Sequence, residues 1–207
     1  MTSVSVIGIG NMGGAIARIA TTAGASVQVL AREADKAAAL AGDTGATAAA
    51  IGEPLTGDIV ILAVPFAAID DVLATYGPQL AGKVVVDITN PVDLATFDGL
   101  VVPGDSSAAA MLQAKAPDAR VVKAFNTNFA STLATGTVGD ATSTVLVAGD
   151  DDAAKAAVIE LVRAGGLRAE DAGSLKRARE LEALGFLQIK LAATEKVGWT
   201  GGFAVVR

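Results

Sequence analysis

The chain has 207 residues, of which 52 % are hydrophobic and 18 % are charged, a composition that favours a globular domain with a well-buried core over a disordered chain. It contains neither cysteine nor histidine, so disulfides and thiolate chemistry are excluded, and the usual ligands of zinc and iron and the commonest general base are missing. Its net charge of −6 argues against nucleic acid as a partner, and no apolar stretch approaches the roughly 20 residues that cross a bilayer. We expect a cytoplasmic protein with no membrane segment and no metal site.

Apolar, β-branched segments alternate with segments rich in alanine and leucine, which is the pattern of a parallel sheet flanked by helices. The predicted strands are 4–8, 26–30, 58–64, 83–87, 120–124, 142–148 and 167–171. The predicted helices are 12–23, 35–40, 67–76, 106–115, 152–164 and 174–196. Residues 41–55 are rich in alanine and glycine and fit neither pattern. The fold expected is a Rossmann-type, doubly wound, mostly parallel α/β sheet with a small C-terminal α/β lobe.

The predicted domain boundary lies near Gly149 and divides the chain into residues 1–148 and 149–207. The three aspartates at 150–152 stand where a helix begins, so we expect them to cap it and to complement its dipole, with a metal site as the alternative. Charge is unevenly distributed, because residues 163–207 carry eight Lys or Arg against five acids, and the first 162 residues therefore carry −9. This basic segment is either a solvated helix face or a wall that faces an anionic ligand.

Glycines at Gly8, Gly10 and Gly13 follow the first strand and open the first helix. In that context the G-x-G-x-x-G spacing is the dinucleotide-binding fingerprint. Gly8 would allow the tight turn out of the strand, Gly10 would let the backbone approach a pyrophosphate at the helix N-terminus, and Gly13 would let the helix pack on the strand. The spacing therefore predicts that a dinucleotide binds here.

The end of the second predicted strand indicates which dinucleotide is preferred. A site selective for NAD places Asp or Glu there, whereas this chain has Ala31 followed by Arg32, with Lys36 one helical turn later. A guanidinium and an ammonium would stabilise a 2′-phosphate. NADP is the predicted cofactor, and the alternative is that both cations are ordinary surface charges, with Glu33 between them.

Two further predicted strands end in "LAVPF" (62–66) and "VDITNP" (86–91), each broken by a proline. Ligands of doubly wound sheets gather outside the carboxyl ends of the strands. We therefore expect these segments to line the nicotinamide side of the site, although each proline could simply end its strand.

Taken together with "GIGNMG" (8–13), "VVKAFNT" (121–127), "VAGDDDAAKAAV" (147–158) and "DAGSLKRARELEAL" (171–184), these motifs resemble the NADP oxidoreductases that use the deazaflavin coenzyme F420. The resemblance covers nearly the whole chain. The same arrangement is similar to the cytosolic domain of the six-transmembrane ferric reductases, which pass the hydride of NADPH to a flavin. The identity of the acceptor therefore stays open between F420 and FMN, FAD or another small acceptor.

The resemblance implies an N-terminal NADP-binding domain and a C-terminal lobe that closes the cleft where the deazaflavin stacks on nicotinamide. The residues expected to bind NADP are Gly8, Ile9, Gly10, Asn11, Met12, Gly13, Arg32, Lys36, Ala63, Val64, Pro65, Asn90, Asn126 and Thr127. The residues expected at the second substrate are Asn126, Lys176, Arg177 and Arg179. For Arg179, a local ion pair with Glu182 is the alternative, and Trp199 either contacts ligand or only packs.

Hydride transfer between two bound rings needs proximity and orientation and no acid–base residue, in agreement with a chain that lacks histidine. We therefore expect an oxidoreductase in which no side chain is catalytic. An NADP-binding redox sensor without turnover is the alternative from another class of protein. Five leucines in 174–196 also suggest a homodimer, unless that helix packs on its own sheet.

Overall fold

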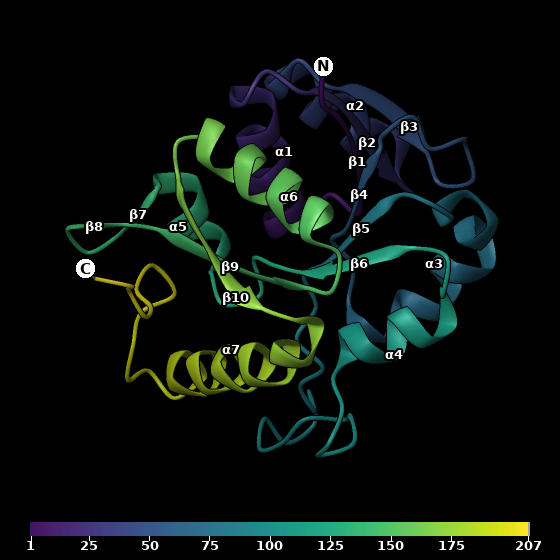
Figure 1. Ribbon diagram of the computed structural model, residues 1–207. Coiled ribbons are helices and arrows are strands. Elements are labelled where there is room, and N and C mark those ends of the chain that lie inside the picture. The colour runs from purple at the N-terminus through teal and green to yellow at the C-terminus, as the bar shows by residue number, and fades with distance from the viewer. Residues whose placement is uncertain (207) are drawn as a thin grey trace.

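A computed structural model describes residues 1–206 and places the core on the two faces of one sheet (Figure 1). Eight strands form this sheet in the spatial order β10-β9-β6-β5-β4-β1-β2-β3. Their bounds are β1 Ser3–Ile7, β2 Ser26–Ala31, β3 Thr47–Ala50, β4 Ile59–Leu62, β5 Val84–Asp87, β6 Arg120–Lys123, β9 Thr144–Gly149 and β10 Arg168–Gly173. All neighbours pair in parallel except β6 and β9, which are antiparallel. The predicted doubly wound, mostly parallel α/β sheet is confirmed.

Among residues 1–206, seven α-helices surround the sheet, and a small hairpin of β7 (Thr137–Val138) and β8 (Ala141–Thr142) lies apart from it. The helices are α1 Asn11–Thr22, α2 Ala34–Thr44, α3 Ile69–Tyr76, α4 Ala108–Lys115, α5 Ala130–Thr135, α6 Asp152–Ala164 and α7 Ala178–Ala193. One core joins the sheet to α1, α5 and α6, and a second core joins its other face to α3, α4 and the start of α7. Interior strands such as β4 are therefore apolar without alternation, because both of their faces are buried.

All seven predicted strands are present, with ends that differ by a few residues. The unassigned residues 41–55 contain the end of α2 and all of β3, an edge strand of Thr and Ala only. Helix α5 was not predicted, and the predicted helix 174–196 is a 3-10 turn, Leu175–Arg177, followed by the shorter α7. Because β10 pairs with β9, the residues after 149 continue the same sheet as those before it, and the two-domain division stays a prediction.

The three aspartates before α6 each have a structural partner. Asp151 is the N-cap and accepts from the Ala154 amide at 2.7 Å, as expected, while Asp150 accepts from the Leu175 amide at 2.9 Å. Asp152 lies 3.1 Å from the Lys155 ammonium. Over residues 1–206, no group of three potential metal-ligating side chains is placed to hold an ion. None of the helices described there is both long and apolar enough to span a membrane.

Candidate active site

Two cavities adjoin at the start of α1, where the parallel strands end. The first, the Gly-loop cavity, has a volume of about 520 Å³ and is lined by residues 7–10, 30–33 and 63–65, by Ile51 and by α3 and the turn before it. The second, the asparagine cavity, measures about 430 Å³ and is lined by Asn11, Met12, Ile88, Asn90, Asn126, residues 128–131, Ile189 and Trp199. Gly10 lines the first cavity and the next two residues line the second, so a single ligand lying across the N-terminus of α1 could reach both.

The three fingerprint glycines have different surroundings. At Gly8, which has φ +99°, a Cβ would come closer than 3.0 Å to the Ala63 carbonyl oxygen. At Gly13, a Cβ would come closer than 3.0 Å to the Gly8 carbonyl oxygen. At Gly10, a Cβ would meet no protein atom within 4 Å, so the space beside this backbone is open. Gly8 and Gly13 therefore serve the packing of β1, β4 and α1, while Gly10 leaves room for a ligand.

The N-terminus of α1 offers its backbone to that open space. Gly10 occupies the N-cap position, no side chain caps the helix, and no acidic side chain stands in the first turn. Free amide groups and the helix dipole at such an end favour an anion. This end of α1 therefore fits a pyrophosphate.

Of the two predicted 2′-phosphate cations, only Arg32 lines the Gly-loop cavity. Its guanidinium lies 3.5 Å from the carboxylate of Asp71 on α3, and both side chains are about three-quarters exposed (78 % and 76 %). Lys36 instead bonds to Glu33 at 2.8 Å. The cavity mouth thus holds one cation and two acids, Glu33 and Asp71, of which Asp71 was not predicted at the site.

The asparagine cavity is shaped by paired amides. The Asn90 amide donates to the Asn126 carbonyl at 2.7 Å, and the Asn126 amide donates to the Asn90 side-chain oxygen at 2.9 Å and to the Leu181 carbonyl at 2.9 Å. At Gly185 on α7, a Cβ would come closer than 3.0 Å to the Asn90 side-chain oxygen. The glycine therefore allows α7 to approach the ends of β5 and β6, which carry the two asparagines.

Phe125, which precedes Asn126, is fully buried and has φ +63°. An aromatic residue in the left-handed region is an outlier that the surrounding structure must hold in place. This turn directs the chain from β6 into the asparagine cavity.

Beneath this cavity lies a cluster of charged side chains, the Lys123 cluster, formed by Lys123, Asp87 and Glu182, which are at most 1 % exposed. The Lys123 ammonium lies 2.9 Å from the Asp87 carboxylate and 2.8 Å from that of Glu182. Glu182 also accepts from the Ala108 amide at 2.9 Å, at the start of α4. Burial raises the pKa of the Glu182 carboxyl, against the opposing effect of the Lys123 ammonium. Glu182 pairs with Lys123, so the alternative of a local pair with Arg179 is wrong.

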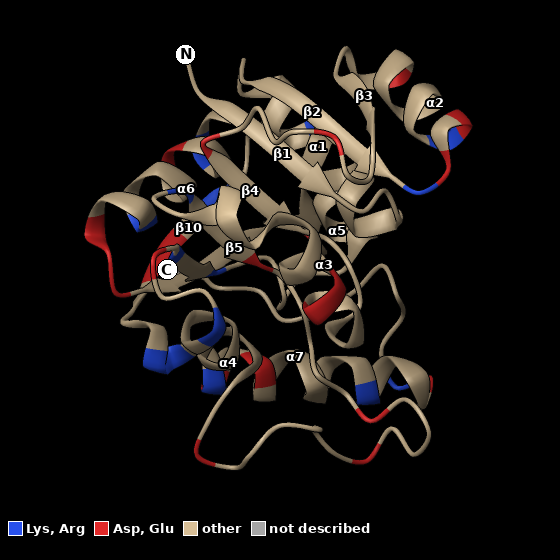
Figure 2. Cartoon of the chain, turned by 90° about the vertical axis from the view of Figure 1, so that its right-hand side faces the viewer, with Lys and Arg blue, Asp and Glu red and all other residues tan. Residues whose placement is uncertain are grey.

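The remaining predicted residues lie outside both cavities. The Thr127 side chain is buried, and its carbonyl accepts from Gln188 at 3.3 Å. Lys176 and Arg179 line another cavity of about 320 Å³ beside the first turn of α7, together with the acids Asp105 and Glu180, and Arg177 lies 3.6 Å from Glu180. Figure 2 shows Lys and Arg residues (blue) close to α4. The basic segment is thus partly neutralised by neighbouring acids.

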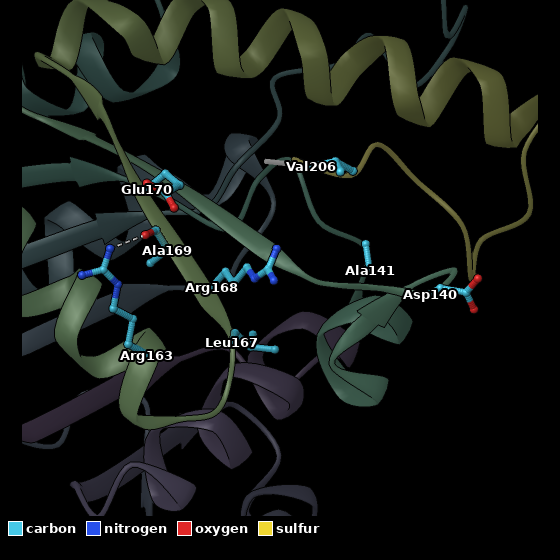
Figure 3. A pocket seen from close by; sticks show the side chains of 8 residues that line it. All are labelled: Asp140, Ala141, Arg163, Leu167, Arg168, Ala169, Glu170 and Val206. Carbon is cyan, nitrogen blue, oxygen red and sulfur yellow. Dashed lines mark hydrogen bonds between the residues drawn. The ribbon is translucent and has the colours of Figure 1, made fainter.

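A larger cavity, about 720 Å³, lies at the outer edge of the sheet beside β10. Figure 3 shows Arg163 reaching from α6 to the Ala169 carbonyl, to which it donates at 2.8 Å, and Val206 standing at the far side. No predicted site residue lines this cavity, so its size does not make it the candidate site.

Trp199 is the only tryptophan of the chain and lines the asparagine cavity with 55 % of its surface exposed. Its ring lies 5.0 Å from that of Phe129, and its carbonyl accepts from the Ser131 hydroxyl. Neither Phe129 nor Asn128 was predicted at the site. The six-residue helix α5, which follows them, is too short to give a periodic signal.

Residues 3–91, which contain the Gly-loop cavity, match the family model described as NADP oxidoreductase coenzyme F420-dependent. The F420-dependent NADP reductase of Methanocaldococcus jannaschii is 34 % identical over 149 residues, which make up 70 % of this chain and 66 % of that protein. A crystal structure from Arthrobacter sp. FB24, provisionally named F420-dependent NADP reductase, superposes with a TM-score of 0.84 over 99 % of both chains at 27 % identity. The rat metalloreductase STEAP3 is 39 % identical over 112 residues, 54 % of this chain but only 22 % of that protein.

The solved structure covers the asparagine cavity and α7 as well as the Gly-loop cavity, so the likeness extends over both halves of the candidate site. The resemblance inferred from "GIGNMG", "LAVPF", "VDITNP" and "VVKAFNT" is confirmed. The chain belongs to the family of NADP oxidoreductases that depend on coenzyme F420.

Proposed function

We propose that this chain carries out the reaction of its family, hydride transfer between NADP(H) and coenzyme F420, across its two adjoining cavities. The proposal rests on one observation: Gly10 lines the Gly-loop cavity, and the next two residues, Asn11 and Met12, line the asparagine cavity. A dinucleotide held by its pyrophosphate at the N-terminus of α1 would place adenosine in the Gly-loop cavity and nicotinamide at the mouth of the asparagine cavity.

Arg32 is the residue we assign to the 2′-phosphate, since it is the cation that lines the Gly-loop cavity. Its pairing with Asp71 is exposed and contributes at most about 1 kcal/mol, so a dianionic phosphate can replace the carboxylate. Lys36 can bind the 2′-phosphate as a second cation only if its ion pair with Glu33 breaks. Preference for NADP over NAD therefore rests mainly on one guanidinium.

The chain's own contribution to hydride transfer is to orient the rings and keep water away. The described lining of the asparagine cavity contains amides, a hydroxyl and apolar groups and no charged side chain. Bound NADPH supplies the hydride, and the balanced reaction, NADPH + F420 + H⁺ ⇌ NADP⁺ + F420H₂, takes its proton from solvent. Holding both rings in contact supplies the catalytic advantage through orientation.

The anionic tail of F420 would extend from this cavity toward Lys176 and Arg179. Lys176 stands in the 3-10 turn before α7 and Arg179 in the first turn of that helix. Ile189, which lines the asparagine cavity, lies ten residues after Arg179, so ring and tail would lie roughly 15 Å apart. The test replaces Lys176 and Arg179, the two cations that line this cavity, by Ala. If the tail binds here, the Michaelis constant for F420 rises, added salt raises it in the wild type, and kcat stays unchanged. A Michaelis constant insensitive to both changes would show a solvated helix face.

The acceptor is identified by measuring NADPH oxidation with F420, FMN, FAD and a ferric chelate under equal conditions. We expect the highest kcat/KM with F420. Quenching of Trp199 fluorescence measures binding of each acceptor without turnover, because this tryptophan lines the cavity. Preference for a flavin or ferric chelate would establish the alternative reductase. NADPH binding with no oxidation by any acceptor would establish a redox sensor.

We place the protein in the cytoplasm and propose that it forms a homodimer. Leu175 and Leu181 are buried within the chain itself, so these two of the five leucines are not available for a dimer interface. On α7 and the described residues after it, the large apolar side chains that remain exposed are Leu187, Trp199, Phe203, Val205 and Val206. Light scattering at micromolar concentration distinguishes a dimer, which would bury this surface, from a monomer.

A further inference from the structure

We infer that Lys123 is a positioning residue for the asparagine cavity, acting through its contacts with Asp87 and Glu182. This inference rests on the proposed function, because it takes that cavity as the place where the second ring meets nicotinamide. Lys123 touches no ligand-accessible surface, since its side chain is fully buried. Its effect on the reaction must therefore pass through the elements that it joins.

Lys123 joins the ends of three elements that are far apart in the sequence. Its ammonium donates to Asp87 at the end of β5 and to the Thr89 carbonyl, the latter at 2.6 Å, and it bonds to Glu182 on α7. Asp87 in turn accepts from the Thr89 amide at 2.8 Å. The Lys123 ammonium thus holds the first turn after β5 at two points, the Asp87 carboxylate and the Thr89 carbonyl.

Each member of the Lys123 cluster stands three residues before a residue that shapes the cavity. Asp87 precedes Asn90, Lys123 precedes Asn126, and Glu182 precedes Gly185, the glycine that lets α7 approach Asn90. Along α7, positions 182, 185 and 189 lie on one face of the helix, and Ile189 lines the cavity. The register of β5 against β6 places Asp87 directly opposite Lys123. A shift of the cluster would therefore move the asparagine pair and α7 relative to one another.

Stability alone does not account for three buried charges at this junction. Well-packed apolar side chains are often as stabilising as a buried ion pair, whereas leaving one of its charges without a partner is strongly destabilising. Apolar side chains could not, however, bond to the Thr89 carbonyl or to the Ala108 amide. The charged cluster fixes how the turns after β5 and β6 are oriented relative to α7. Hydride transfer between two rings requires a fixed orientation of this kind.

The experiment compares wild type with Lys123→Met and Glu182→Gln, using Lys155→Met as the matched control. Lys155 is also largely buried (9 % exposed) and pairs with Asp152 and Asp171, but neither it nor its partners line the asparagine cavity. Three quantities are measured: the melting temperature, the dissociation constant for NADPH, and kcat and KM for F420 well below the melting temperature.

We expect both cluster variants to lower kcat/KM for F420 at least tenfold while the NADPH dissociation constant stays within threefold, because the cluster contributes nothing to the Gly-loop cavity lining. The control should lower the melting temperature and leave kcat/KM unchanged. A folded Lys123→Met protein with a lower melting temperature and wild-type kcat/KM would overturn the inference. If Lys123→Met does not fold, Glu182→Gln decides in the same way, since it keeps the shape of the side chain and the Lys123–Asp87 pair.

Failure of the proposed function gives a different result. A wild type that binds NADPH but reduces none of the tested acceptors and shows no Trp199 quenching by any of them overturns both the proposed function and this inference. A wild type that prefers a flavin overturns only the identity of the acceptor, and the variants are then compared with that flavin. Unchanged kinetics in folded variants of an active wild type overturn the positioning role alone.

Discussion

Separate substitutions of Gly10 and Gly13 should change different properties, because Gly10 leaves room for a ligand whereas Gly13 packs against backbone. Gly10 has φ −63° and ψ −177°, a backbone conformation open to any residue, and no protein atom lies within 4 Å of a Cβ there. Gly10→Val removes a favourable N-cap residue, which costs about 1 kcal/mol at most. In a chain of this size that corresponds to a fall in melting temperature of about 4 °C or less. The variant should fold.

The same valine would occupy the space that we assign to the pyrophosphate. An anion at a helix N-terminus is stabilised by up to about 2 kcal/mol, and each charge-assisted hydrogen bond contributes about 1.5–3 kcal/mol. These contributions together exceed about 2.7 kcal/mol, and losing that much raises the dissociation constant for NADPH about a hundredfold. We therefore expect at least hundredfold weaker binding, measured by fluorescence titration of the folded variant.

Gly13→Ala should have the opposite profile. Its Cβ would collide with the Gly8 carbonyl, a backbone atom that cannot rotate away, and such overpacking costs about 1–3 kcal/mol. The gain in helix propensity, about 1 kcal/mol, offsets only part of this cost. The melting temperature should fall, as seen in thermal unfolding by circular dichroism. Near-normal NADPH binding by folded Gly10→Val, or full stability of Gly13→Ala, would refute this division of roles.

Arg32→Ala should weaken NADPH binding at least tenfold, about 1.4 kcal/mol, and leave NADH nearly unchanged, whereas equal wild-type affinities for the two would contradict the assignment. Asp71→Asn should strengthen NADPH binding severalfold in the same titration, because it removes an acid that lies 3.5 Å from Arg32, and an unchanged constant would show that Asp71 is too solvated to compete. The Lys155 ammonium holds the pKa of Asp171 below its ordinary 3.8, so the stability from this pair is present above that pH and lost as the pH falls through the lowered value. Urea unfolding of Lys155→Met should therefore show a deficit at pH 7 that shrinks below about pH 3.8, and a deficit independent of pH would exclude the ion pair as its cause.

Where the sequence carried a periodic or positional signal, the elements and the first cavity could be predicted. The strands of the sheet interior are rich in Val, Ile and Leu, β4 being a continuous run of them, and the glycines stand directly after β1. The edge strand β3 was missed because Thr and Ala are compatible with a helix as well as a strand. Contacts between distant segments gave no local signal, and Asp71 reaches Arg32 only because α3 folds back over the end of β2.

The Lys123 cluster was hidden for a related reason. "VVVD" and "RVVK" each end in one charge, which resembles an ordinary strand end at the surface. Only the register that places Asp87 opposite Lys123, together with α7 covering both, reveals that the charges are buried. The role of Gly185 was likewise not predictable, because it depends on Asn90, which lies against this glycine only in the folded chain.

The uncharged lining of the asparagine cavity has a consequence for how the rate depends on acidity. Its described residues include no carboxylate, amine or imidazole, so nothing in the cavity wall changes protonation state between mildly acidic and mildly basic solution. Any inflection in the rate across that range would then belong to the coenzymes themselves, to the phosphate-binding end of the protein, or to Glu182 beneath the cavity, whose pKa is raised by burial. With a deazaflavin or a flavin as acceptor, the same polypeptide should accordingly trace two different pH profiles, and the difference between them is a property of the molecule that it holds.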